Sequence, residues 1–207
     1  MRNALPWLLL MLLPQVAVGD PTTDFWGWFK GDAERIRAAM DDERTRESMA
    51  YWLGRVAPGL SYELRQGKRK RQLILSADGN MARFVTVENI VRAAPRIKGW
   101  KFIALRPSEK RPYPVVVGDV RLDPEVTYFD LYQDTGRLGV VLYLPEFDAE
   151  HVESYRIAAR RLLCQVLGER KVGQEIGFID FDDQQVRDMQ FSRPFSEFRE
   201  VFDVLLK

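Results

Sequence analysis

The order of the sequence patterns predicts an α+β fold in a single domain, with a mainly antiparallel mixed sheet and flanking helices. Helical patterns come first, most strand patterns follow in the middle of the chain, and helical patterns return near its end. Of the 207 residues, 46% are hydrophobic and 29% are charged, a composition typical of globular proteins. The sequence contains no internal repeat and no linker rich in Pro, Gly or Ser, so we expect all elements to share one core.

Residues 1–19 have the pattern of a signal peptide. Arg2 supplies a positive charge, an apolar stretch follows, and the triplet from Ala17 to Gly19 offers a cleavage site. The apolar stretch is about nine residues long, whereas a membrane-spanning helix needs roughly 20, and no second such stretch follows. We therefore expect cleavage after Gly19, no transmembrane segment in the mature chain, and a periplasmic or secreted location.

The first part of the mature chain is predicted to be helical and then to form a β-hairpin. Residues 24–57 have helical spacing, with a break at Gly31 and a stop before Pro58. Apolar and polar residues alternate from residue 60, and an apolar run follows the polar turn at residues 66–68. This pattern indicates a hairpin whose second strand is the more central one.

Four aromatic residues lie just after the predicted cleavage site: Phe25, Trp26, Trp28 and Phe29. We expect these side chains to pack into the core, because the burial of large aromatic side chains holds a chain end against the domain. The alternative is a stacking platform for sugars or an anchor at a membrane interface.

The middle of the chain holds most of the predicted strands. A short amphipathic helix over residues 84–94 comes first. Strand patterns then cover residues 100–105, 115–117, 126–132 and 138–144. The last two are joined by a turn and are predicted to form a second hairpin.

The last part of the chain is predicted to contain a helix, a strand and a final helix. Helical spacing covers residues 149–167 and a strand pattern covers residues 172–181. Phe195, Phe198 and Phe202 then recur at three- and four-residue steps, which predicts a C-terminal amphipathic helix.

These patterns divide the chain into the signal peptide, an α+β domain over residues 20–183, and a connector with a helix over residues 184–207. We expect the C-terminal helix to pack on the domain. Ile157 and Cys164 lie among arginines on the side of their helix opposite the main apolar stripe, so we expect the C-terminal helix to cover that side.

Charge and residue counts exclude several classes of function. The chain has 31 basic and 30 acidic residues, which leaves no basic excess for binding nucleic acid. It has one His and one Cys, too few for metal sites built from several of these ligands. The loops typical of nucleotide-binding proteins and the Gly-x-Ser-x-Gly motif of hydrolases do not occur. We therefore predict no metal and no cofactor.

His151 and Cys164 do not form a catalytic pair in this interpretation. They are thirteen residues apart on one predicted helix, which places them ~20 Å apart. Cys164 is more readily interpreted as a small buried apolar residue. Without such a catalytic pair, we favour a non-enzymatic function for the chain.

The candidate ligand-binding residues lie on the predicted sheet. Tyr128, Asp130 and Tyr132 share one face of a predicted strand, and Arg106 follows another strand. Together they would form a polar patch of a carboxylate, phenols and a guanidinium. The alternative is a structural ion pair or a solvent-facing row of side chains.

A second candidate surface is the basic run Lys68, Arg69, Lys70 and Arg71 at the tip of the first hairpin. It could contact an acidic partner or a phosphate-bearing lipid. The alternative is a solvated surface run.

Short motifs along the chain resemble a family of uncharacterised bacterial proteins. They are Phe25-Trp26-Gly27-Trp28-Phe29, Ser76-Ala77-Asp78-Gly79, Ala93-Ala94-Pro95, Gly99-Trp100-Lys101 and Leu105-Arg106-Pro107. The resemblance covers residues 25–182 and implies an α+β domain of unknown activity, with no catalytic residues to carry over. The export signal and the aromatic helix after Arg193 depart from the family pattern.

Export and the lack of a catalytic motif predict a non-enzymatic binding or protein-interaction domain of the bacterial cell envelope. Its partner would be an envelope protein or a small ligand. One alternative is a carboxylate-based hydrolase of envelope glycan that uses two of Asp130, Glu146 and Asp180. Another alternative is a partner protein that neutralises a toxin.

Overall fold

The protein has an α+β fold, as the sequence predicts. The computed structural model describes residues 19–134 and 136–206, so the predicted signal peptide falls almost entirely outside the described residues. No helix in the described part is long and apolar enough to cross a membrane.

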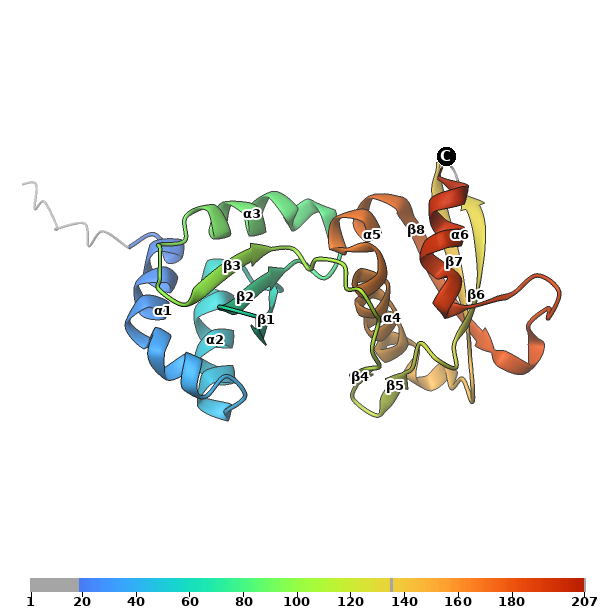
Figure 1. The fold of residues 1–207 in the computed structure, drawn as a ribbon, viewed down its shortest axis with the longest axis horizontal. Coiled ribbons are helices and arrows are strands. Elements are labelled where there is room, and N and C mark those ends of the chain that lie inside the picture. Colours follow the sequence, from blue (N-terminus) through green and yellow to red (C-terminus); the bar gives the residue numbers. More distant parts are fainter. Residues whose placement is uncertain (1–18, 135, 207) are drawn as a thin grey trace, which may run out of the picture.

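The first half of the chain forms one lobe, which we call the N-terminal lobe (Figure 1). Its elements are α1 (Pro21–Ala38), α2 (Glu43–Val56), β1 (Ser61–Gln66), β2 (Arg71–Ser76), α3 (Phe84–Arg92) and β3 (Trp100–Ala104). The sheet has the order β1-β2-β3, with β1 antiparallel and β3 parallel to β2. β2 is therefore the central strand, as its apolar run predicts.

The second half forms the C-terminal lobe. Its elements are β4 (Val115–Val117), β5 (Val120–Leu122), β6 (Tyr128–Asp134), β7 (Arg137–Leu144), α4 (Val152–Leu167), α5 (Glu169–Glu175), β8 (Ile176–Asp183), β9 (Arg193–Pro194) and α6 (Phe198–Leu205). β4 and β5 form a small hairpin, and the larger sheet has the order β8-β7-β6-β9. Only β7 and β8 are parallel in this sheet.

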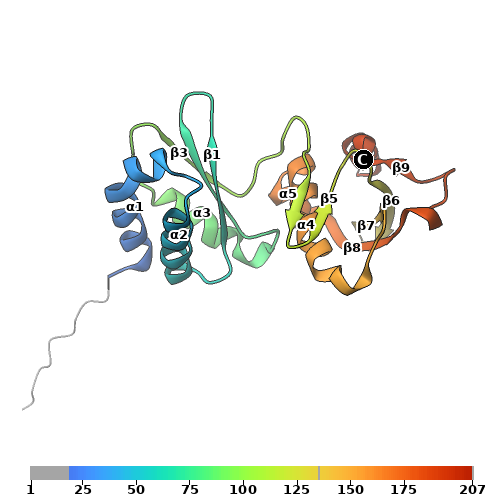
Figure 2. The same cartoon turned by 90° about the horizontal axis from the view of Figure 1, so that it is seen from below.

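Within the described residues, the buried apolar side chains form two clusters rather than the one core that the sequence suggests. One cluster joins the helices and the sheet of the N-terminal lobe, and the other joins α4, α6 and the larger sheet of the C-terminal lobe. Two views show the lobes side by side (Figures 1 and 2). The strands likewise fall into three sheets. The sequence could not predict this division, because periodicity identifies strands but does not specify which strands pair.

The aromatic residues of α1 belong to the core of the N-terminal lobe. Phe25 and Phe29 are fully buried, Trp26 donates a hydrogen bond from Nε1 to Ile90 O (2.8 Å), and Trp28 stacks on Trp52. The interpretation as a core helix is confirmed. The predicted break at Gly31 is wrong, because α1 continues to Ala38 and the chain turns between α1 and α2 instead.

Helix α6 packs on the C-terminal lobe through its aromatic face. Phe198 and Phe202 are fully buried, and the Phe198 ring lies 4.8 Å from Phe129 of β6. The expected cover over Ile157 and Cys164 is wrong, because Ile157 is exposed while Cys164 is buried beside α5 and the N-terminal lobe. Helix α4 therefore packs against the sheet of the C-terminal lobe with one side and faces the N-terminal lobe with the other side.

The predicted strand over residues 172–181 begins too early. Residues up to Glu175 belong to helix α5, and β8 begins at Ile176. The sequence also gives no separate signal for the short strand β5.

Candidate functional site

Strand β6 has a free edge for much of its length. β9 pairs with β6 at two residues only, next to a hydrogen bond from Phe195 N to Thr127 O (2.9 Å). Successive residues of a strand direct their backbone groups to opposite edges, so Leu131 and Gln133 direct theirs away from β7. In the described part of the chain neither residue has a backbone partner on that side.

A cavity of about 600 Å³ lies beside this edge, and we call it the edge groove. Its walls come from β6, from the loop before β9 and from α6. Phe191 and Val186 of the loop are 68% and 63% exposed, and Leu205 of α6 is also exposed. Exposed apolar side chains around a groove are a feature of binding surfaces.

Asp130 is the central polar group of the edge groove. Its carboxylate accepts hydrogen bonds from Tyr143 Oη (2.8 Å) and Tyr132 Oη (3.3 Å). Burial and the charge of Asp130 raise the pKa of the Tyr143 phenol above its usual range, so this phenol remains protonated and continues to donate. The predicted placement of Asp130 and Tyr132 on one strand face is thus present, and Tyr143 of β7 joins them.

Tyr128 lies on the same strand face but does not line the edge groove. The guanidinium of Arg187 covers its ring at 4.0 Å from the centroid, a cation–π geometry. Arg106 does not join this face either, so the four predicted ligand-binding residues do not form a single patch.

Arg106 lies at the junction of the two lobes instead. Its guanidinium donates to Ser76 Oγ (2.6 Å), to Ser61 Oγ (3.0 Å) and to the carboxylate of Asp78. Burial raises the pKa of Asp78, but the charge and hydrogen bond of Arg106 outweigh this effect and the net shift is downward. The alternative interpretation of Arg106 as part of a structural ion pair agrees with these contacts.

Glu169 completes the junction, and the sequence analysis did not identify it. The side chain is fully buried. Oε1 accepts from Ala77 N (2.8 Å) and Gly79 N (3.0 Å), and Oε2 accepts from Arg106 N (2.8 Å). Hydrogen bonds to a carboxylate are among the stronger ones in proteins, and through these three bonds Glu169 connects α5 to both segments of the N-terminal lobe that reach it.

No local signal marks Glu169, because a glutamate in the first turn of a helix is common. Two of the motifs that carry the family resemblance meet at this residue: Ser76-Ala77-Asp78-Gly79 and Leu105-Arg106-Pro107. The backbone at Asp78 and Leu105 has positive φ (49° and 63°), an unusual conformation for residues other than glycine. Each of these two residues is next in the chain to a residue whose N–H donates to the carboxylate.

Cys164 is expected to be unreactive in the folded protein. Burial, with the added negative charge of Glu169, raises the pKa of its thiol to about 12, and the thiolate is the reactive form. We expect no labelling by a disulfide reagent at neutral pH and complete labelling in denaturant. Since the unfolded thiol ionises near 9, the free energy of unfolding should fall as the pH rises from there toward 12. Rapid stoichiometric labelling of the native protein would contradict this prediction.

The basic run occupies the turn between β1 and β2, which projects from the N-terminal lobe (Figure 2). Lys68, Arg69 and Lys70 are exposed, and Arg71 at the start of β2 is half-buried. Their position at a hairpin tip agrees with the sequence. No contact among the described residues favours a specific partner over the solvated alternative.

The three carboxylates of the hydrolase hypothesis do not share a cavity. Asp130 and Asp180 are both paired with Val141, so β7 separates them. Neither Asp180 nor Glu146 lines the edge groove, which Asp130 does line. We therefore do not propose glycan hydrolysis.

The described residues contain no group of three or more His, Cys, Asp or Glu side chains arranged to hold a metal ion. His151 lies on the surface beside Asp148, with Nδ1 at 2.9 Å from Oδ2.

Scans of protein-family models, curated proteins and solved structures find no match to this chain. The resemblance to uncharacterised bacterial proteins stays a prediction.

Proposed function

We propose that the protein is a non-enzymatic protein-interaction domain of the bacterial cell envelope, which binds an extended segment of a partner protein along the free edge of β6. The observation that carries the proposal is the set of unpartnered backbone groups of Leu131 and Gln133 beside the edge groove. An added strand would supply backbone hydrogen bonds to these groups, and its alternate side chains would enter the groove.

The charges around the groove define the chemistry of the partner segment. Asp130 and Asp188 are the carboxylates in the lining, and Arg193 is the cation. Arg193 lies 3.9 Å from Glu197, so acidic charge is in excess. A complementary segment would carry one apolar side chain that packs near the exposed Phe191 and one basic side chain that pairs with the carboxylates of Asp130 and Asp188.

The proposed location rests on the predicted signal peptide and not on the fold. A module that recognises extended segments needs no catalytic group, which agrees with the absence of catalytic motifs in the sequence. A periplasmic or secreted protein would meet such segments in loops and termini of other envelope proteins.

The proposal can be tested with a pair of substitutions at one exposed residue. Gln133→Pro removes the backbone N–H that faces the free edge and places a ring there, whereas proline at an edge position leaves the pairing with β7 intact. Gln133→Ala keeps the N–H and serves as the control. We expect peptides selected from a displayed random library on the wild-type protein to bind Gln133→Ala normally and Gln133→Pro at least about tenfold more weakly.

Hydrogen exchange gives an independent readout of the same contact. The amides of Leu131 and Gln133 should become protected when a selected peptide binds. A library selection in which no enriched peptide distinguishes Gln133→Pro from Gln133→Ala would refute the proposal. A wild-type dimer that the proline variant dissociates would also contradict it, since a second copy of the chain would then occupy the edge.

A further inference from the structure

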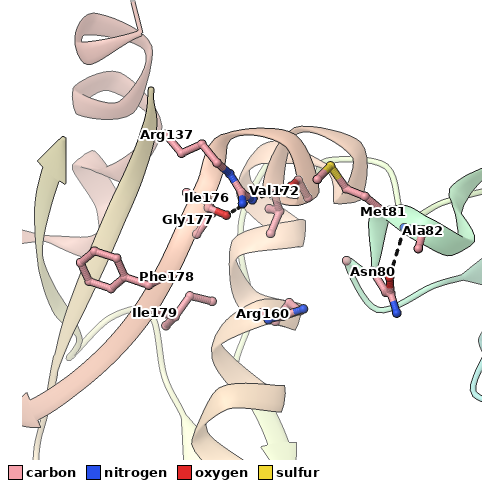
Figure 3. A pocket seen from close by; sticks show the side chains of 12 residues that line it. Asn80, Met81, Ala82, Arg137, Arg160, Val172, Ile176, Gly177, Phe178 and Ile179 are labelled. Atoms are coloured by element: carbon pink, nitrogen blue, oxygen red, sulfur yellow. Dashed lines mark hydrogen bonds between the residues drawn. The ribbon is translucent and has the colours of Figure 1, made fainter. Parts of the chain in front are cut away.

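A second cavity, of about 440 Å³, lies between the lobes and is separate from the edge groove. Its walls come from the turn after β2 in the N-terminal lobe and from α4, α5 and the starts of β7 and β8 in the C-terminal lobe. We call it the interlobe cavity. Figure 3 shows Arg160 extending from α4 toward the turn that carries Asn80, with Arg137 beside Ile176.

The charged side chains in the wall of the interlobe cavity are two arginines, Arg137 and Arg160. No Asp or Glu side chain that the structure describes lines this cavity. Arg160 makes no ion pair with a described residue, and its one hydrogen bond is a long contact to Asp78 O (3.4 Å). This positive charge is therefore not neutralised within the wall.

Arg137 is held in place by backbone groups of the cavity wall. Its Nη2 donates to Gly173 O of α5 (2.8 Å) and to Ile176 O at the start of β8. Its Nε is buried and has no hydrogen-bond partner among the described residues. Because Nε is closed off from solvent, an anion in the cavity would be bound by the remaining donors of the guanidinium.

The opposite part of the wall is apolar. Ile179 of β8 and Val172 of α5 contribute to it, and Figure 3 shows Ile179 on the side of β8 that faces Arg160. The Phe178 ring lies over Gly139, where a Cβ atom would come within 2.1 Å of the ring. The ring therefore lies over β7, and Figure 3 shows it directed away from Arg160.

We propose that the interlobe cavity binds a small organic anion whose phosphate or carboxylate group contacts Arg160 and Arg137 and whose apolar part packs against Ile179. Guanidinium groups match the geometry of both anionic groups with paired hydrogen bonds. The volume corresponds to roughly 15 water molecules, which suits a ligand of one ring or a short chain. The site does not depend on the proposed binding of a partner segment.

The test uses three probes and two variants on the same helix. Phenyl phosphate and benzoate carry an apolar ring on each type of anion, and inorganic phosphate has no apolar part. Arg160→Gln removes the unneutralised charge of an exposed side chain, so the fold should persist. Arg156→Gln is the control, because Arg156 lies one turn earlier on α4, outside the cavity wall.

We expect saturable binding of phenyl phosphate or benzoate, measured by NMR titration, in the millimolar range or tighter. Arg160→Gln should weaken this binding at least about tenfold, and Arg156→Gln should leave it unchanged. The preferred probe distinguishes a phosphate ligand from a carboxylate ligand. Inorganic phosphate should bind more weakly than phenyl phosphate.

Three results would overturn the proposal: no saturable binding of either aromatic probe, equal weakening by both arginine variants, or equal affinity for inorganic and phenyl phosphate. Gln133→Pro should leave anion binding unchanged. Failure of this site is therefore distinguishable from failure of the proposed edge interaction.

Discussion

Replacing Glu169 by alanine is expected to destabilise the protein by about 3–5 kcal/mol, because removal of one partner from a buried charged network leaves its other members unsatisfied. Three backbone N–H groups lose their acceptor in this variant, those of Ala77, Gly79 and Arg106. The side chain is fully buried, so water does not readily replace the carboxylate. The loss should loosen the junction between the two lobes as well as lower overall stability.

Urea unfolding with two probes would measure this effect. Four of the five tryptophans, Trp26, Trp28, Trp52 and Trp100, lie in the N-terminal lobe, and the fifth, Trp7, precedes the predicted cleavage site. Tryptophan fluorescence of the chain from Asp20 onward therefore reports on that lobe. Labelling of Cys164 reports on the junction. We expect both transitions to shift to lower urea in Glu169→Ala, and neither to shift appreciably in Glu175→Ala at the end of the same helix. Unchanged transitions in Glu169→Ala would show that the three hydrogen bonds do not stabilise the junction.

Replacing Phe198 by alanine is expected to cost about 3–5 kcal/mol, the range for truncation of a large buried aromatic residue. Phe198 is fully buried between Phe129 of β6 and the neighbouring rings of Phe195 and Phe202. The substitution leaves a cavity under α6 that neighbouring rings cannot fill without moving.

Val204→Ala on the same helix is the matched control, because Val204 is 63% exposed. Its effect should stay within about 0.5 kcal/mol. Urea unfolding followed by far-UV circular dichroism would compare the two variants with the wild type. A Phe198→Ala variant as stable as the Val204→Ala variant would mean that α6 contributes little to the stability of the C-terminal lobe.

Local patterns predicted most helices and strands close to where they occur. The spacing of Phe84 and Val87 predicted α3, and the apolar run around Ile74 predicted a central strand. The errors arose where a local preference was outweighed. Gly31 costs α1 about 1 kcal/mol relative to alanine, but the burial of Phe29 and Ile36 on either side keeps the helix continuous.

The candidate sites were predictable only in part. The period of a strand places Asp130 and Tyr132 on one face, and the structure joins them by a hydrogen bond. Arg106 could not be assigned from its sequence position, since its partners come from β1 and from the turn after β2. The interlobe cavity could not be anticipated either, because it exists only where two lobes meet.

The sequence by itself determined the α+β class, the aromatic core of α1 and the strand face that carries Asp130, because these follow from periodicities within short segments. Only the tertiary structure decided that there are two cores, that Glu169 accepts hydrogen bonds from Ala77 and Arg106, and that β9 leaves most of the β6 edge free. These features depend on contacts between residues that are distant in the chain. Such contacts are set by which apolar faces can be buried together, and no local pattern records that outcome.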